Sequence, residues 1–292
     1  MAGRGGGQPD EAGFGRAVPR IAKEDRPFDL GAFDLDGTVL EGEVGISERT
    51  VAAVGRLRGL GARIVVATGR RFEGAHPHAV RLGLGGEDPV VCYGGAMVRR
   101  LGGETLLHRT LPRDLSVAFL RWASRRDLHA RVFTDGRIAL GPDAARYRLR
   151  PPAGPGVFAV DSPARWLANA DDEPTKLAVA DSPAGVEGWL EEAQETFRGR
   201  LFLTRSHPYY VEVLAPGSTK SGALGFLCER WGIDPARVIA FGDADNDIDM
   251  LRFAGRGVAV EPMTEEVGEA ADALIPYRID GVARYLDGLL GR

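Results

Sequence analysis

The chain has 292 residues, of which 44% are hydrophobic and 27% are charged, and this composition is typical of a soluble globular protein of one large or two ordinary domains. Its 37 basic and 41 acidic residues give a net charge of −4, so the sequence offers no uniform cationic surface for nucleic acid. No apolar run approaches the ~20 residues that a membrane helix needs. We therefore expect neither a nucleic-acid partner nor a membrane partner.

Residues 1–26 are rich in glycine and charge and contain no continuous apolar stretch. This composition predicts a disordered tail and is not typical of a secretory signal. We therefore expect the protein to be cytoplasmic.

From residue 27 onward, strand-like apolar runs alternate with helical patterns. This alternation predicts an α/β core with a doubly wound parallel sheet that is covered by helices on both faces. The first expected elements are a strand over 28–35, a helix over 47–60, a strand over 63–67, a helix over 72–82 and a strand over 89–93. The pattern resumes with a helix over 218–231, a strand over 237–241, a helix over 247–253, a strand over 257–260 and a helix over 264–271.

The section between these two halves has a different pattern and predicts an inserted α+β cap domain over residues 102–213. The core then comprises residues 27–101 and 214–292, and the chain crosses between the domains near Gly102-Gly103 and Pro216-Gly217. The elements expected in the cap are a helix over 112–126, a hairpin around Asp135-Gly136, a loop over 151–156, a strand over 175–180, a helix over 184–197, and strands over 200–204 and 209–214.

The first predicted strand ends in the acidic run Asp34-Leu35-Asp36-Gly37-Thr38. Open α/β sheets bind their ligands at the carboxyl ends of strands, so these carboxylates are candidates for chemistry. A turn at Gly37 would let one carboxylate and a nearby backbone carbonyl face one cation. The alternative is an ordinary tight turn, because Asp-Gly is a common turn pair.

Two further motifs could bind an anion. The strand over 63–67 ends in Thr68-Gly69-Arg70, at the start of a helix whose N–H groups attract phosphate, although Thr68 could simply be the N-cap. Lys220 lies in the first turn of a helix, where a cation opposes the helix dipole. Because the chain has only three lysines, this position indicates an anionic partner, with a solvated side chain as the alternative.

The last motif is the acidic run from Gly242 to Asp249 after the strand over 237–241. So much negative charge is costly without a cation. An EF-hand is excluded, since Ile248 and Ala254 stand where Gly and Glu are needed. We expect Asp243 to be a metal ligand and Asp247 a second-sphere or alternate ligand, with Asp245 and Asp249 solvated, and all-oxygen ligands favour Mg²⁺.

Together these motifs resemble the four ordered motifs of the haloacid dehalogenase (HAD) superfamily, and the large insert resembles its Cof-type phosphatases. The resemblance covers nearly all of the chain after residue 27. Lys176 and the stretch 206–213 are similar to recurring Cof-type cap features. The run Tyr93-Gly94-Gly95-Ala96 departs from the family pattern, because Gly94 stands where an asparagine is usual.

The resemblance implies a mechanism in which Asp34 attacks phosphorus and Asp36 is the general acid and base. It implies Mg²⁺ held by Asp34, the backbone carbonyl of Asp36, and Asp243, with Asp247 supporting the metal site. It also implies that the substrate phosphate contacts Thr68, Gly69, Lys220 and Asn246. The implied function is a Mg²⁺-dependent phosphatase for small phosphorylated metabolites such as sugar phosphates.

Two alternatives stay open at this point: a phosphomutase with the same aspartate pair, and a phosphosugar-binding regulator without turnover. Arg70 is a candidate for contact with the cap or the substrate, or for a salt bridge between the domains. For the oligomeric state, we expect a monomer or a homodimer. Candidate substrate contacts in the cap, each with a solvated alternative, are Arg131, Arg146, Tyr147, Arg148 and His207.

Overall fold

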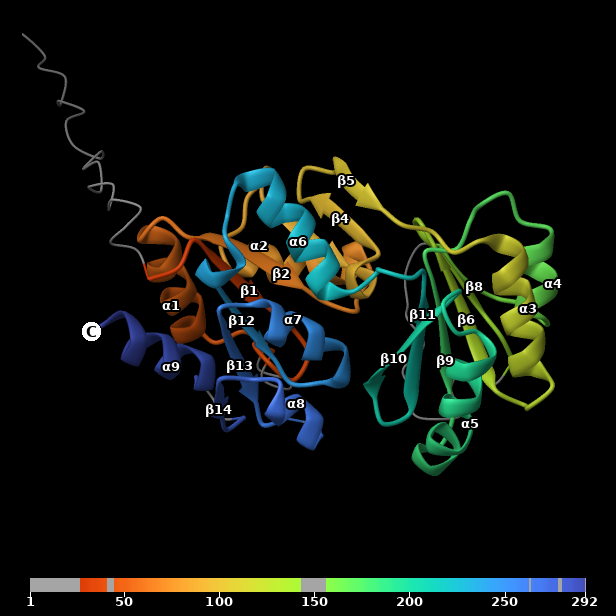
Figure 1. Ribbon diagram of the computed structural model, residues 1–292. Coiled ribbons are helices and arrows are strands. Elements are labelled where there is room, and N and C mark those ends of the chain that lie inside the picture. The colour runs from red at the N-terminus through yellow and green to blue at the C-terminus, as the bar shows by residue number, and fades with distance from the viewer. Residues whose placement is uncertain (1–26, 41–44, 143–155, 263, 278–279, 292) are drawn as a thin grey trace, which may run out of the picture.

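The structure is a computed structural model that describes residues 27–40, 45–142, 156–262, 264–277 and 280–291. The predicted tail and the candidates Arg146, Tyr147 and Arg148 lie outside these residues, as does most of the loop expected over 151–156. No helix among the described residues has the length and apolar character that a bilayer crossing requires. Figure 1 shows two bodies, a core built from both ends of the chain and a cap built from its middle.

The core is organised around one eight-stranded sheet. Its first six strands are parallel, and its last two add to the edge in antiparallel fashion. This is the α/β core with a parallel sheet that the sequence predicts. In spatial order the strands are β14 (Ala273–Ile275), β13 (Arg256–Val260), β12 (Val238–Gly242), β1 (Leu30–Phe33), β2 (Arg63–Ala67), β3 (Pro89–Cys92), β4 (Met97–Arg100) and β5 (Thr105–His108).

Helices cover both faces of this sheet, and the central strands are apolar on both sides for that reason. Helices α1, α2 and α9 pack on one face, and α6 and α7 pack on the other. Ser47 caps α1 by accepting a hydrogen bond from the Thr50 N–H. The helices of the core are α1 (Glu48–Gly59), α2 (Phe72–Arg81), α6 (Lys220–Trp231), α7 (Ile248–Phe253), α8 (Glu265–Glu269) and α9 (Gly281–Leu290), with short 3₁₀ turns η2 (Tyr93–Gly95), η3 (Pro235–Arg237) and η4 (Asp245–Asp247).

The register of the central strands brings the predicted motifs together. Phe33 at the end of β1 lies opposite Phe241 in β12 and Val66 in β2. The rings of Phe33 and Phe241 stack with their centres 5.1 Å apart. The chain therefore leaves β1, β2 and β12 at the same edge of the sheet, which is the edge that faces the cap in Figure 1.

The cap is a second, separate sheet with its helices on the side away from the core (Figure 1). The predicted hairpin is present, since Asp135 and Gly136 join two antiparallel strands. In spatial order the strands are β10 (Phe202–His207), β11 (Tyr210–Leu214), β9 (Lys176–Ala180), β6 (His129–Thr134), β7 (Arg137–Leu140) and β8 (Val157–Ala159). The helices are α3 (Arg113–Ser124), α4 (Pro163–Ala168) and α5 (Pro183–Thr196).

Alternation along the cap strands gives the sheet two different faces. Leu177 and Val179 of β9 pack against the cap helices, whereas Ala178 joins the hydrophobic cluster that continues into the core. The Tyr93 ring of the core meets the Phe133 ring of the cap edge-on, with the ring centres 6.4 Å apart. The inner face of the cap sheet thus packs on the core.

The domain boundary differs from the expected one in one respect. We expect the cap to begin at residue 102, but β5 pairs with β4 and completes the core sheet. Gly103, with a φ of +103°, allows the chain to turn back between these two strands. Each strand has only four residues, and the two adjacent, partly buried arginines that end β4 interrupt the alternation that would have indicated a strand.

Candidate active site

The loop after β1 delivers two aspartates to the sheet edge. The Asp34 N–H donates to the Phe241 carbonyl at 3.0 Å, which extends the strand pairing up to the first aspartate. Gly37 then turns the chain with a φ of +79°, and a Cβ on it would lie 2.3 Å from Asp243 Oδ2. The tight turn is therefore real, and it also lets the two acidic loops approach each other.

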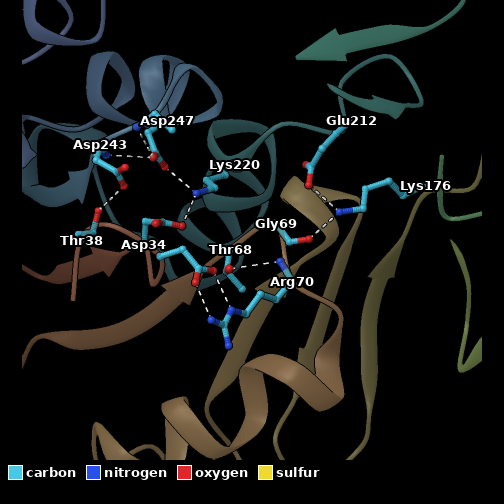
Figure 2. A network of polar contacts seen from close by, with 12 residues as sticks. Asp34, Thr38, Thr68, Gly69, Arg70, Lys176, Glu212, Lys220, Asp243 and Asp247 are labelled. Atoms are coloured by element: carbon cyan, nitrogen blue, oxygen red, sulfur yellow. Dashed lines mark hydrogen bonds and ion pairs between the residues drawn. The ribbon is translucent and has the colours of Figure 1, made fainter. Parts of the chain in front are cut away.

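Lys220 lies between two of the buried carboxylates (Figure 2). Its Nζ is 2.6 Å from Asp34 Oδ1 and 2.6 Å from Asp247 Oδ1, and the residue is 1% exposed. Burial acts to lower the pKa of Lys220, but the charges of Asp247 and Asp34 outweigh it, so the pKa is raised and the ammonium is retained. The alternative of a solvated lysine is thereby excluded.

The other carboxylates are held by donors from the surrounding loops. Asp243 accepts a hydrogen bond from Thr38 Oγ1 at 2.9 Å, and Asp247 Oδ2 accepts from the backbone N–H groups of Asp243 and Ala244. Burial raises the pKa of Asp243 to about 7, helped by the charge of Asp247. Burial also raises the pKa of Asp34, and Lys220 opposes that rise.

These three aspartates could hold a metal ion. One carboxylate oxygen from each of Asp34, Asp243 and Asp247 lies within 4.8 Å of the others. Three carboxylates with one lysine leave an excess of negative charge in a buried place, which a cation would relieve. The donors are all oxygen, so the set fits a hard cation. Asp247 already accepts hydrogen bonds at both oxygens, which suits a supporting position better than direct ligation.

The loop after β2 gives the cavity a hydroxyl and a backbone turn. Thr68 is 1% exposed, and its Oγ1 accepts a hydrogen bond from the Arg70 N–H at 3.2 Å. Helix α2 has its N-cap at Arg71, so the alternative of Thr68 as the N-cap is not realised. The Gly69 carbonyl accepts from Lys176 Nζ of the cap at 2.7 Å.

Arg70 binds Asp36, a pairing that the sequence does not predict. Its Nε and Nη2 contact the two carboxylate oxygens at 2.7 and 2.5 Å. Arg70 Nη1 also lies 2.9 Å from His78 Nε2 on α2. All three residues belong to the core, so Arg70 forms no salt bridge between the domains within the part of the chain that the structure describes.

A cavity of about 660 Å³ lies between the core and the cap. Its size is typical of sites for small molecules. Of the predicted residues, Asp34, Asp36, Thr68, Gly69 and Asn246 line it, and of the candidate cap residues Arg131 and His207 do. Its remaining lining residues are Arg70, Arg71, Gly74, Phe133, Ile138, Lys176, Ser206, Tyr210, Glu212 and Ala244.

A buried ion pair of the cap touches the core loop (Figure 2). Lys176 Nζ lies 2.6 Å from Glu212 Oε1, and both side chains are less than 5% exposed. Glu212 Oε2 has no hydrogen-bond partner among the described residues. Gly94 is next to this oxygen, since a Cβ on Gly94 would be 3.1 Å away. The sequence indicates Lys176 by its rarity, but its partner becomes visible only in the fold.

Two aspartates expected to be solvated have partners instead. Asp245 binds Arg205 of the cap at 2.8 Å and accepts from Thr264 Oγ1 at 2.9 Å. Asp249 accepts from both the N–H and the hydroxyl of Ser221, at the start of α6. The prediction was wrong because these partners come from segments distant in sequence.

Comparison with known proteins identifies the family. A model of haloacid dehalogenase-like hydrolases matches residues 32–286. The HMP-PP phosphatase of Klebsiella pneumoniae is 32% identical over 231 residues, which are 78% of this chain and 82% of that protein. The chain belongs to the haloacid dehalogenase-like hydrolase family. The resemblance carried by the four motifs is thus confirmed.

Further relatives of this hydrolase agree. The 5-amino-6-(5-phospho-D-ribitylamino)uracil phosphatase of Bacillus subtilis is 28% identical over 282 residues, 90% of this chain and 97% of that protein. The structure of a HAD subclass IIB sugar phosphatase matches with a TM-score of 0.75 at 22% identity, covering 89% of this chain and 98% of that one, and it supports the fold. The chain is a phosphatase of the haloacid dehalogenase-like hydrolase family.

Proposed function

We propose that this hydrolase is a Mg²⁺-dependent phosphatase that cleaves sugar phosphates through a phosphorylated intermediate on Asp34. The observation that carries the proposal is the contact of Lys220 with Asp34, in a buried cluster that also holds Asp243 and Asp247. A lysine in this place keeps a nucleophilic carboxylate oriented at the wall of a cavity. Names of two relatives, a phosphoribityl compound phosphatase and a sugar phosphatase, support a sugar phosphate as substrate.

In the first step the Asp34 carboxylate attacks phosphorus, and the bond from phosphorus to the leaving oxygen breaks. Asp36 supplies the proton that this oxygen needs. In the second step Asp36 takes a proton from water, and that water attacks the aspartyl-phosphate to release phosphate and restore Asp34. Thr68, Gly69, Lys220 and Asn246 would contact the phosphoryl oxygens, which places donors where negative charge grows.

The metal would be held by Asp34, the backbone carbonyl of Asp36 and Asp243, and Asp247 would keep that shell and Lys220 in place. A bound Mg²⁺ would reduce the repulsion between the carboxylate and the phosphate. Arg70 now holds Asp36 through both carboxylate oxygens. The Asp36 carboxyl group must therefore break or weaken its contact with Arg70 when it donates a proton.

Phosphate release from a panel of phosphorylated metabolites tests the proposal. With Mg²⁺ present, sugar phosphates should be hydrolysed, and both EDTA and Asp34→Asn should abolish the release. The exposed Asp114 on α3 offers a control, and Asp114→Asn should retain full activity. No release by folded protein with Mg²⁺, or transfer of phosphate between sugars without release, would contradict hydrolysis. Transfer without release would identify a phosphomutase.

The cytoplasmic location and the oligomeric state, a monomer or a homodimer, stay predictions.

A further inference from the structure

The cap side of the cavity, which we call the roof, carries a buried arginine. Arg131 of β6 is 7% exposed and lines the same cavity as Asp34. In the register of the cap sheet it pairs with Ala178, and Ala178 pairs with Glu212. The side chain between the two charged residues is thus a single methyl group.

Tyr210 lies next to this arginine. The Arg131 guanidinium carbon lies 5.7 Å from the centre of the Tyr210 ring. Burial raises the pKa of Tyr210, so its hydroxyl keeps its proton at neutral pH. A protonated hydroxyl can donate a hydrogen bond to a ligand. The pair therefore presents hydrogen-bond donors in one place.

The charges on the roof favour an anion. Lys176 and Glu212 bind each other and neutralise one another. Burial lowers the pKa of His207, so the imidazole is neutral at neutral pH. Among the described cap residues that line the cavity, Arg131 thus contributes a positive charge in addition to the Lys176–Glu212 ion pair. A guanidinium can donate two parallel hydrogen bonds to two oxygens of one carboxylate or phosphate group.

We propose that Arg131 and Tyr210 form a subsite for a second anionic group, a carboxylate or a second phosphate, on the part of the substrate that leaves. The inference rests on the proposed phosphatase function and narrows its substrates to phosphorylated sugar acids or bisphosphates. The phosphate that reacts lies on the core floor, and the second anion lies on the cap roof. Arg131 is then a specificity residue and takes no part in the bond-breaking steps.

Binding to the Asp34→Asn variant tests the subsite without turnover. Calorimetry would compare two matched pairs, 3-phosphoglycerate against glycerol 3-phosphate and fructose 1,6-bisphosphate against fructose 6-phosphate. The subsite predicts that, in at least one pair, the member with the additional anionic group binds about tenfold more tightly, which corresponds to about one charged contact. The pair that shows the preference tells a carboxylate from a phosphate ligand.

In the Asp34→Asn background, Arg131→Gln should remove this preference. It should change the affinity for the ligand without the additional anionic group by less than about twofold. Arg131→Lys should keep part of the preference. Arg121→Gln, at an exposed arginine on α3, is the matched control and should change nothing. Equal affinities within both pairs, or a preference that survives Arg131→Gln, would overturn the proposal. Phosphate release by the wild-type enzyme from glycerol 3-phosphate and fructose 6-phosphate, which lack the additional anionic group, reports separately on the proposed function.

Discussion

At the scale of single residues, Lys220 decides whether the cluster of aspartates is stable. It is buried between Asp34 and Asp247, and Asp243 lies close by. Breaking a buried ion pair by removing one partner leaves uncompensated charge, which is more costly than never having had the pair. The same contacts hold Asp34 in the orientation that attack requires.

Replacing Lys220 with methionine should therefore lower the free energy of unfolding by about 3–5 kcal/mol and abolish phosphate release. Urea denaturation in EDTA measures the first effect and the release assay the second. Asp34→Asn serves as the control, since it should abolish release while costing far less stability. An unchanged urea midpoint in Lys220→Met would show that the ion pairs do not hold the site together.

In the structure, Lys220 contacts Asp34, and Asp34 and Thr68 line one cavity. The sequence indicates these three residues because strand ends and helix starts have clear local signals. It does not predict the partners of Arg70, Asp245 or Glu212. Those pairings join segments far apart in the chain, and their geometry depends on how the loops pack.

At the scale of elements, α6 must start close to the η2 turn for Lys220 to reach the aspartates. Gly95 of η2 has a φ of +107°, and a Cβ there would lie 2.0 Å from the Thr219 carbonyl at the N-cap of α6. Any side chain would push the start of this helix away. Gly103 has a similar φ of +103° but has nothing within 4 Å of the Cβ position.

The two glycines form a matched pair for mutation. Both Gly95→Ala and Gly103→Ala add left-handed backbone strain of about 1 kcal/mol, but Gly95→Ala also displaces Lys220. We expect Gly95→Ala to lose most of its phosphate release and to be clearly less stable, while Gly103→Ala keeps its activity. Thermal unfolding and the release assay measure the two effects. Equal activities in the two variants would mean that α6 can shift without harm.

The fold class and most elements follow from periodicity, and β2 is predicted over its full length, Arg63–Ala67. The strands β4, β5, β8 and β14 are missed, and each has only three or four residues. Such short strands have too few alternating positions to give a signal, and hydrogen bonds to neighbouring strands hold them in place.

At the scale of the whole molecule, polar contacts hold the cap against the core around the cavity. Arg205 of β10 binds Asp245 of η4 at 2.8 Å, and Arg99 of β4 binds Asp135 of the cap hairpin at 2.8 Å. A cap that closes over the site excludes water and surrounds the leaving group. These contacts should therefore influence how often the enzyme is in its closed form.

Arg205→Gln should lower kcat/KM for phosphate release about two- to fivefold with little loss of stability, because an ion pair that still contacts solvent, here with side chains 25% and 20% exposed, contributes about 0.2–1 kcal/mol. Arg126→Gln is the matched control, since it removes an ion pair within the cap, between Arg126 just after α3 and Glu192 of α5. Among the described residues, Arg126 also contacts Trp122, which belongs to the cap as well. Steady-state kinetics and thermal unfolding measure both variants. Equal kcat/KM values for the two would exclude a role of the cross-domain pair in closure.

The most direct test of the account is to locate the phosphoryl group on the enzyme. A substrate with a good leaving group, p-nitrophenyl phosphate, needs no acid in the first step, whereas the second step still needs Asp36 as a base. Asp36→Asn should therefore accumulate the phosphorylated enzyme, and acid quenching with peptide mass spectrometry should find one phosphoryl group on Asp34. Release of p-nitrophenol with Asp34 unmodified, or a phosphoryl group on another residue, would contradict the central claim that Asp34 is the nucleophile.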